Sequence, residues 1–398
     1  MTRWGVRYLA ALVLAASLFA CARIRPAPRP PEIPADITSL TLIGQYSIPP
    51  MQRFPPTIGL PLGGISGLTE RDAGGEIWGI SDAQLGGRLY RFVLEGIGES
   101  LRVSPADVVP LDGAPGRDRT DDESLALVPD GTMIVCAEGS SSEPRLPPAL
   151  MQYGRHGEFM RMLQVRDRYT PEPTGPVTKG ARGNAGFESV TIPPEGDRLF
   201  AGVETALVQD GEPASFDVGT QARLLEYIPR HGTFEPAREF VYSLEPVLKP
   251  DFTPGFSING LADLLALNRT TLLALERGYV EEAGRAGLGM NRIRIYRVSL
   301  TGASDVSALD SLKGQTGIVP ATKTLLVDLG QVPGLSPELA PRLDNFEGMT
   351  FGPRLPDGRA TLLLVSDDNF SETQRTWFLL FAIGSNAVGR SSGGPVDR

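Results

Sequence analysis

A repeated hairpin constrains the fold of this 398-residue chain more than any other feature. Near its start, each copy has a polar residue, then a small one or Ser, then an apolar strand-like run. It turns through Gly, Asp, Asn or Pro and ends with a second apolar run that closes on Asp or Glu. The five copies are residues 65–82, 122–138, 187–204, 258–276 and 346–367. Units of this kind bury their apolar faces only against one another, so we expect a repeat architecture.

The segments that follow the hairpins repeat as well. They are rich in Leu, Tyr and Arg, and most of them contain a glycine turn: 88–96, 149–163, 223–244, 292–302 and 375–383. Each unit is therefore expected to have four strands, and four-stranded units repeated around a ring form a β-propeller.

The ends of the chain predict how the ring closes. The tail after Ile383 is polar and offers no fourth strand for the last unit, whereas residues 40–48 read as a strand before the first unit. Pairing the two would cover both sheet edges. We therefore predict an all-β propeller with five recognisable repeats, closed by an N-terminal strand. Residues 305–330, in which TKTLLVDLG reads as an outer strand, leave a sixth blade open.

One segment conflicts with this interpretation. Residues 261–276 are rich in Leu and Ala and, taken alone, favour a helix. The repeat alignment places residues 268–270 where the other units turn, and so predicts two strands. A single helix here would remove one of the five units.

The first twenty residues have the pattern of an export signal. A short basic head precedes an apolar run of 13 residues, which is too short to span a bilayer. The run ends in LFAC, which resembles a bacterial lipoprotein box with Cys21 as the lipidated residue. The alternative is cleavage after Ala22, which would give a free secreted protein.

The domain organisation follows from this leader. Residues 22–36 are proline-rich and are expected to form an extended tether. A single propeller is predicted over 38–383 and a flexible tail over 384–398. We expect a protein exported to the bacterial cell envelope, lipid-anchored in the periplasm or outer membrane.

The net charge of −9 and the absence of a long basic run argue against a nucleic-acid partner. Only Cys21 and Cys136 are present, and Cys136 lies in an apolar strand-like run. The sequence therefore predicts neither a disulfide framework nor a zinc site. The two histidines, His156 and His231, occupy equivalent Arg-His-Gly turns, which indicates a turn position rather than a catalytic one.

The hairpins place their acids at one end of the propeller. In a hairpin the start of the first strand and the end of the second lie together, and rotation brings all such ends to one face. The expected pairs are Glu123 with Glu138, Glu188 with Glu204, and Glu347 with Asp367. Clustered carboxylates repel one another unless protons or a cation intervene, and their oxygens suit Ca²⁺.

These considerations give a set of candidate site residues. The candidate catalytic residues are Glu123, Glu188 and Glu347. The candidate calcium ligands are Asp121, Asp122, Asp344, Asp367 and Asp368. The cations expected to hold an anionic substrate are Arg119, Lys179, Arg182 and Arg277. A structural role, in which the repeated acids bind backbone N–H groups of loops or neighbouring blades, is an equal alternative for the three glutamates.

Three segments resemble the phytase-like family, described as having an esterase-like domain of phytase: FESVTI, DDESLALVPDG and DNFEGMTF. The resemblance runs from about Gly63 to Phe370. It implies a β-propeller and, by analogy with β-propeller phytases, Ca²⁺-dependent hydrolysis of phosphate esters. Those phytases have six blades, whereas five units are recognised here, and none of their catalytic motifs maps onto this chain.

Other hydrolase classes lack their signatures. The G-x-S-x-G match at 389–393 lies in the polar tail and follows no strand, which argues against an α/β-hydrolase. Two hypotheses remain open. The first is a calcium-dependent phosphoesterase acting on a small anionic substrate. The second is a non-catalytic propeller, expected to be monomeric like the first, that binds a small ligand or an envelope partner.

Overall fold

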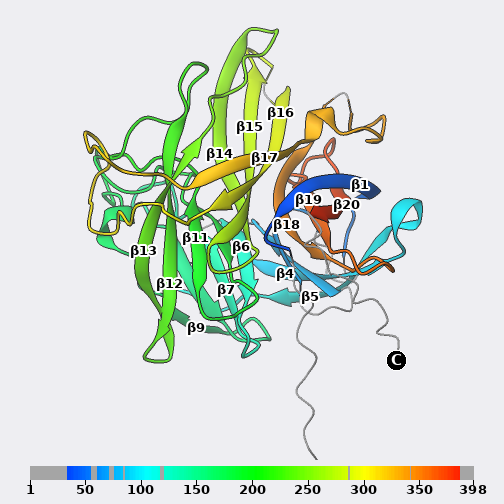
Figure 1. The fold of residues 1–398 in the computed structure, drawn as a ribbon, viewed down its shortest axis with the longest axis horizontal. Helices are drawn as coiled ribbons and strands as arrows, with labels where there is room; N and C mark the ends of the chain where they lie inside the picture. Colours follow the sequence, from blue (N-terminus) through cyan, green and yellow to red (C-terminus); the bar gives the residue numbers. More distant parts are fainter. Residues whose placement is uncertain are drawn as a thin grey trace, which may run out of the picture. The chain divides into compact units, whose positions relative to one another are not determined.

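The repeated hairpins form the inner halves of five four-stranded antiparallel sheets in the computed structural model. The structure describes residues 34–54, 61–70, 76–83, 86–116, 121–285, 287–340 and 342–385. The predicted leader, Cys21, most of the tether, Arg119 and most of the tail lie outside these residues. The fold is a five-bladed β-propeller with almost no helix, as predicted (Figure 1).

Each blade is a sheet whose strands follow chain order from the centre outward, apart from the last strand of blade 5. Blade 1 contains β2 (Ile65–Glu70), β3 (Glu76–Ser81), β4 (Arg88–Glu95) and β5 (Arg102–Pro110). Blade 2 contains β6 (Asp122–Leu127), β7 (Met133–Ala137), β8 (Ala149–Tyr153) and β9 (Phe159–Met162). Blade 3 contains β10 (Phe187–Thr191), β11 (Leu199–Val203), β12 (Thr220–Arg230) and β13 (Thr233–Leu244). Blade 4 contains β14 (Pro254–Ala266), β15 (Thr271–Glu282), β16 (Gly289–Ser299) and β17 (Thr322–Asp328). Blade 5 contains β18 (Asn345–Gly352), β19 (Thr361–Asp367), β20 (Thr376–Ser385) and β1 (Ile37–Ile48).

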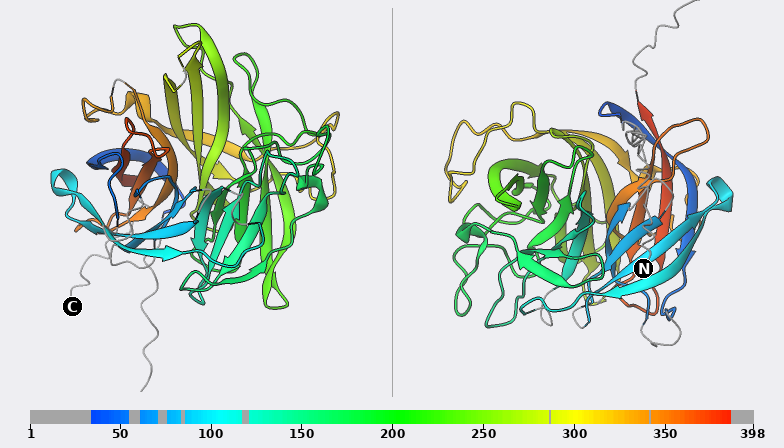
Figure 2. Two further views of the ribbon diagram at one scale, coloured as in Figure 1. Left: turned by 180° about the vertical axis from the view of Figure 1, so that it is seen from behind. Right: turned by 90° about the horizontal axis from the view of Figure 1, so that it is seen from below.

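The ring closes through β1, the predicted N-terminal strand. It pairs antiparallel with β20, from Ile37 opposite Ser385 to Ile48 opposite Thr376. Figures 1 and 2 show the blue strand β1 lying beside the red strand β20. Chain segments from opposite ends of the sequence thus complete one blade, which leaves neither end of the repeat array as an exposed sheet edge.

Two sequence alternatives are settled by blade 4. The Leu- and Ala-rich residues 261–276 form parts of β14 and β15, with the turn at 268–270, and not a helix. β17 pairs with β16 as the outer strand of blade 4, so residues 322–328 belong to that blade and not to a sixth.

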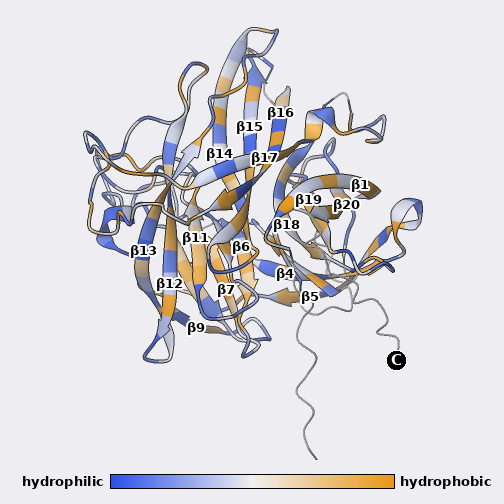
Figure 3. Ribbon diagram, viewed as in Figure 1, coloured by the Kyte–Doolittle hydropathy of each residue, from blue (hydrophilic) through white to orange (hydrophobic). Residues whose placement is uncertain are grey.

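The core lies between neighbouring sheets, where their apolar faces meet. β7 and β11 are buried along their whole length, and Figure 3 shows hydrophobic residues concentrated on such strands. Cys136 is a buried free thiol within β7, as its sequence context predicts. Among the described residues there is no helix long and apolar enough to cross a membrane.

Every inner hairpin contains a β-bulge in its first strand, near the start of the strand in blades 1, 2, 3 and 5 and in the second half of β14 in blade 4. The pairing register shifts by one residue in each case, so that one residue has no partner in the ladder. The bulged residues are Ser66, Glu123, Glu188, Ala262 and Glu347 in blades 1 to 5. Bulges of this kind re-aim a side chain and are frequent next to functional sites.

Glycines allow the inner strands to approach closely. A Cβ on Gly348 would lie 2.9 Å from the carbonyl oxygen of Ser66, and one on Gly67 would lie 2.6 Å from that of Glu123. Gly67 and Gly348, which directly follow the bulged residues of blades 1 and 5, therefore face the backbone of the next blade. Their lack of a side chain allows the inner strands to lie close together around the channel.

Candidate functional site

The bulged residues and the residues that end the second strands gather at one end of the channel. The acids that interact with one another there are Asp82, Asp121, Glu123, Glu138, Glu188, Glu204, Glu347, Asp367 and Asp368, and we call them the acid ring. They come from blades 1, 2, 3 and 5 and from the adjoining loops. These electrostatic interactions link acids of different blades, whereas a role for the acids as a binding face stays a prediction.

Blade 4 departs from this pattern. Its bulged residue is Ala262, where blades 2, 3 and 5 have glutamate. Arg277 pairs with Gly260, two residues before the bulge, just as Glu138 pairs with Asp121 and Glu204 with Gly186. Blade 4 therefore contributes a cation at the position where the other four blades have an acid.

Aligned with ISGL of blade 1 (residues 65–68), INGL of blade 4 (residues 258–261) would put the ring positions of blade 4 at Asn259 and Glu276, whereas the structure puts them at Ala262 and Arg277. Glu276 is fully buried outside the ring, where its carboxylate accepts hydrogen bonds from Tyr242 at 2.9 Å and Asn259 at 3.0 Å. Lys323 and Arg294 also contact it. The bulge in β14 is at Ala262, three residues after Asn259, which is the position equivalent to the bulged Ser66 of blade 1. Because of this difference, Glu276 turns toward blade 3 and Arg277 turns toward the ring.

Burial makes ionisation of the ring unfavourable. Desolvation, followed by repulsion from Glu347 and other acids, raises the pKa of Asp82 to about 8. Burial raises the pKa of Glu138 to about 8, against the effect of a hydrogen bond with Glu188. Burial also raises the pKa of Glu204 to about 7, although the charge of Arg277 lowers it. Near neutral pH the ring thus retains protons unless a cation replaces them.

Desolvation is likewise the main cause that raises the pKa values of the candidate catalytic glutamates. The pKa of Glu123 lies well above its ordinary value because of burial and the nearby Glu138. That of Glu188 is also well raised, and this residue shares a hydrogen bond with Glu138. Burial raises the pKa of Glu347, while Arg277 and a hydrogen bond from Asn345 at 2.9 Å oppose the shift.

Three acids of blade 2 have the spacing of a cation site. Ligand oxygens of Asp121, Glu123 and Glu138 all lie within 4.8 Å of one another. Glu138 is 7% exposed, and its Oε2 atom has no hydrogen-bond partner within the described chain. An all-carboxylate donor set with a buried, unsatisfied oxygen fits a hard cation such as Ca²⁺.

Beneath the ring, Asp263 ties three blades together. It occupies the position after the bulge, where the other blades have Gly or Ser, and it is 2% exposed. Its carboxylate accepts hydrogen bonds from the backbone N–H of Met349 at 2.7 Å and of Leu264 at 2.8 Å, and from the Ser124 hydroxyl at 3.5 Å. This side chain therefore has a structural role in the channel below the ring.

The acids of the last hairpin divide between the ring and the loops. Asp367 and Asp368 belong to the ring, and Asp368 also accepts hydrogen bonds from the backbone of Gly64 at 2.9 Å and of Phe370 at 3.1 Å. Asp344 instead holds the loop before β20, through Gln374 at 3.2 Å and the N–H of Arg375 at 3.3 Å. Asp122 is buried at the first position of β6.

The candidate substrate-binding cations differ in their surroundings. Arg277 pairs with Glu347 at 3.1 Å and Glu204 at 3.4 Å. Arg182 donates to the carbonyl oxygens of residues 206 and 211, although it lines one small cavity together with Glu138. Lys179 forms an exposed pair with Asp167 at 2.6 Å. Of these three, Arg277 is the one in direct contact with ring acids.

Asp82, Glu138 and Glu204 were not among the candidate catalytic or metal-binding residues, although all three belong to the ring. Their sequence signal was available, because each is the acid that closes the second run of its hairpin. The candidates come from the first strand of each hairpin, from the loops and, in blade 5 only, from the end of the second strand at Asp367, whereas the geometry brings the ends of the second strands of blades 1, 2 and 3 to the ring as well.

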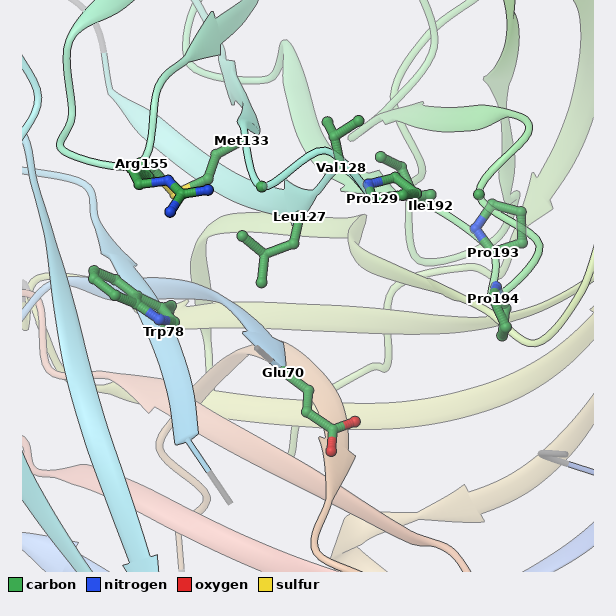
Figure 4. Close-up of a pocket in the computed structure, with 12 residues that line it drawn as sticks. Glu70, Trp78, Leu127, Val128, Pro129, Met133, Arg155, Ile192, Pro193 and Pro194 are labelled. Atoms are coloured by element: carbon green, nitrogen blue, oxygen red, sulfur yellow. The ribbon is translucent and has the colours of Figure 1, made fainter. Parts of the chain in front are cut away.

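A second candidate site lies at the other end of the inner hairpins. A cavity of about 480 Å³ is lined by the turn regions of blades 1, 2 and 3. Figure 4 shows Trp78, Met133 and Arg155 on one side of it and Pro193 and Pro194 on the other. Its volume lies in the range of small-molecule sites.

Comparison with known proteins identifies one family. A family model described as "Phytase-like: Esterase-like activity of phytase" matches residues 60–370. An "Uncharacterized secreted protein" of the fungus Arthroderma benhamiae is 27% identical over 175 residues, which is 38% of this chain and 33% of that protein. The chain thus spans about a third of the length of this curated relative.

Among solved structures the likenesses are distant. The N-terminal domain of Nup159 is 11% identical, with a TM-score of 0.30 over 88% of this chain and 98% of that one. A protein from Lactobacillus plantarum is also 11% identical, with a TM-score of 0.29 over 76% and 77% of the two chains. Neither likeness bears on function.

Proposed function

The chain belongs to the phytase-like family, and from this premise we propose that it is a calcium-dependent hydrolase of phosphoric esters that acts at the acid ring. The observation that carries the proposal is the group of Asp121, Glu123 and Glu138, with ligand oxygens within 4.8 Å of one another. The buried and unpartnered Oε2 of Glu138 adds a specific place for a cation.

These three residues would hold the calcium ion. When bound, Ca²⁺ offsets the negative charge of the ring, admits an anionic ester and polarises its phosphoryl oxygens. Asp367 and Asp368, from blade 5, are further candidate ligands because they interact with Asp82 and with each other at the ring.

The chain's own groups supply the remaining chemistry. A carboxylate with a pKa near the working pH is a suitable general base, and Asp82, which lies outside the proposed calcium group and has a pKa of about 8, meets that condition. Among the candidate catalytic glutamates, Glu188 lies outside the proposed calcium group and burial raises its pKa well above the ordinary value, so it is a second candidate to accept a proton from water. The attacking water oxygen bonds to phosphorus, the ester P–O bond breaks, and the proton accepted from water passes to the departing oxygen, which leaves as the alcohol.

Arg277 is the candidate group for orienting the substrate. Its guanidinium is 17% exposed and lies between acids of blades 3 and 5. Guanidinium groups bind phosphate oxygens in a fixed geometry, which would place the ester above the ring. Lys179 pairs with Asp167 and Arg182 donates to backbone carbonyl oxygens, so neither contacts a ring acid through these interactions. Arg119 is a candidate from the sequence alone.

A hydrolysis assay tests the proposal. The mature protein is incubated with a panel of phosphomonoesters, p-nitrophenyl phosphate and inositol phosphates among them, in chelator and then with added Ca²⁺. We expect turnover that chelator abolishes and Ca²⁺ restores, and that Glu138→Gln lowers at least tenfold. The matched control, Glu226→Gln, changes an acid that is 1% exposed and pairs with Arg198 and Arg238 outside the ring, and it is expected to retain activity. No turnover across the panel with Ca²⁺ present would refute the proposal.

A second candidate function is a non-catalytic propeller that binds a small ligand. The cavity of about 480 Å³ at the opposite end of the inner hairpins favours it, because this cavity is remote from the acids in each hairpin. Under this alternative Ca²⁺ raises the melting temperature without any turnover. The ring acids would then stabilise the propeller, and an envelope protein or small molecule would be the partner.

We further propose export to the cell envelope and anchoring through a lipid on Cys21. The supporting observations are the leader-like residues 1–20 and the secreted relative. Mass spectrometry of the mature N-terminus tests this, since lipidation adds diacylglycerol to Cys21 and Cys21→Ser prevents it. An unmodified terminus after Ala22 would indicate simple secretion.

A further inference from the structure

The place of Arg277 in the ring suggests how many cations the ring accepts. In the propeller, blade 4 lies between blades 3 and 5, and Arg277 reaches an acid from each of them. Its Nη2 atom lies 3.1 Å from Oε1 of Glu347 in blade 5 and 3.4 Å from Oε1 of Glu204 in blade 3. One guanidinium therefore supplies positive charge to two neighbouring acids that would otherwise repel each other.

The contacts of Arg277 point to the acids and not to the backbone. Its Nε atom is buried and has no hydrogen-bond partner among the described residues. An arginine held for structural reasons commonly donates to carbonyl oxygens, as Arg182 does at residues 206 and 211. The carboxylates alone thus fix the guanidinium, as they would fix a bound cation.

The other side of the ring has a different charge balance. Asp82 and Glu138, in blades 1 and 2, each retain a buried carboxylate oxygen without a hydrogen-bond partner in the described chain. Glu138 is more than nine-tenths buried and belongs to the group whose ligand oxygens lie within 4.8 Å of one another. Unsatisfied acceptors are therefore found beside blades 1 and 2, whereas the acids beside blade 4 have Arg277.

We infer that Arg277 takes the place of a second cation, so that the ring accepts a single divalent cation, bound beside blades 1 and 2. This inference rests on the proposed calcium function and specifies its stoichiometry. Arginine suits this role because its charge is permanent at all physiological pH values. A fixed charge of this kind keeps Glu204 and Glu347 paired whether or not the divalent cation is present.

Isothermal titration of the mature full-length protein with CaCl₂ tests the inference. We expect one site in the wild type and two in Arg277→Met, which frees Glu204 and Glu347. Arg292→Met is the matched control: it removes an arginine of blade 4 that pairs with Asp328 at 2.8 Å, and it should leave one site. One site in both the wild type and Arg277→Met would overturn the inference and leave the calcium proposal intact.

A second measurement covers the case in which Arg277→Met does not fold. If Arg277 already neutralises Glu204, Glu204→Gln should change the calcium dissociation constant of the folded protein less than threefold. Glu138→Gln should raise it at least tenfold. Equal losses in the two variants would overturn the inference. A wild type that binds no Ca²⁺ would refute the calcium proposal and, with it, the single site inferred here.

Discussion

Replacing Glu138 by Gln should stabilise the protein in the absence of calcium, and calcium should reduce or reverse that gain. Glu138 has an ordinary pKa of 4.5 in the unfolded chain and a pKa of about 8 in the fold. The folded state therefore binds more protons than the unfolded state, and stability falls as the pH rises through this window. At about 1.4 kcal/mol per pH unit between 4.5 and 7, the loss at pH 7 reaches about 3 kcal/mol.

Glutamine keeps the shape of the side chain and does not titrate. In chelator at pH 7, Glu138→Gln should therefore raise the free energy of unfolding by about 1–3 kcal/mol. The lower value applies if neighbouring acids titrate together with Glu138 and retain part of its proton. In Ca²⁺ at a hundred times its dissociation constant, the wild type gains about 2.7 kcal/mol. The variant loses a ligand, and a tenfold weaker site forfeits about 1.4 kcal/mol of that gain. The stability advantage of the variant should thus shrink or reverse.

Thermal and urea unfolding at pH 7, followed by circular dichroism in EDTA and in CaCl₂, measures both differences. Glu226→Gln is the control, because Glu226 is 1% exposed but pairs with Arg198 and Arg238 far from the ring. That control should be destabilised equally in both conditions. If Glu138→Gln behaves in the same way, its carboxylate is a structural acceptor and the reasoning about the ring is wrong.

Three further predictions concern the ring, its loops and the closure of the propeller. Asp344→Ala should lower stability by about 1–2 kcal/mol with or without Ca²⁺ in urea unfolding, because Gln374 and the Arg375 N–H lose their acceptor; unchanged stability would contradict this. In chelator, stability should decrease from about pH 4.5 to about pH 8, where the ring acids lose protons, and Ca²⁺ should flatten the curve; melting temperatures that rise across this range would contradict the raised pKa values of Asp82 and Glu138. Deleting residues 1–48 removes β1 and exposes β20, so cooperative unfolding in calorimetry should be lost, and a sharp transition near the wild-type temperature would show that closure is dispensable.

The architecture was predictable because it depends on a pattern that every unit repeats. Alternation of apolar runs and turns specifies hairpins, and a polar tail after Ile383 leaves the last blade short of a strand. Since an open propeller exposes two sheet edges, a spare strand at the other terminus had one place to pair. The helical composition of residues 261–276 did not prevail, because packing between neighbouring blades outweighs intrinsic propensity.

The site was only partly predictable, because its details depend on backbone register. INGL in blade 4 resembles ISGL in blade 1, yet the bulges fall at Ala262 and Ser66, three residues apart in the aligned segments. Side-chain letters do not specify where a ladder gains an extra residue. A shift in that position exchanges Glu276 for Arg277 at the channel, and with it the sign of a charge.

The loop cations show a second kind of limit. Lys179 and Arg182 were placed near a substrate because their loop enters the acid face, and the loop does bring Arg182 to the small cavity that Glu138 also lines. Its guanidinium, however, is used by carbonyl oxygens of the following loop. Such contacts depend on how two irregular segments pack, for which the sequence has no periodic signal.

A ring built from five equivalent hairpins would hold a ligand on the propeller axis, at equal distance from every blade. This ring is not equivalent at all positions: blade 1 has Ser66 in place of a bulged glutamate, and blade 4 has Ala262 and Arg277. The charge of the ring is therefore not symmetric about the axis: its acids come from blades 1, 2, 3 and 5, and the fixed positive charge of Arg277 comes from blade 4. An anionic group that contacts both a cation beside Glu138 and Arg277 must span the channel, so the direction of its remaining atoms is set. Under the proposed function, we expect selectivity among substrates to depend on the loops that border Glu138, which include residues 140 and 145, more than on the repeated hairpins themselves.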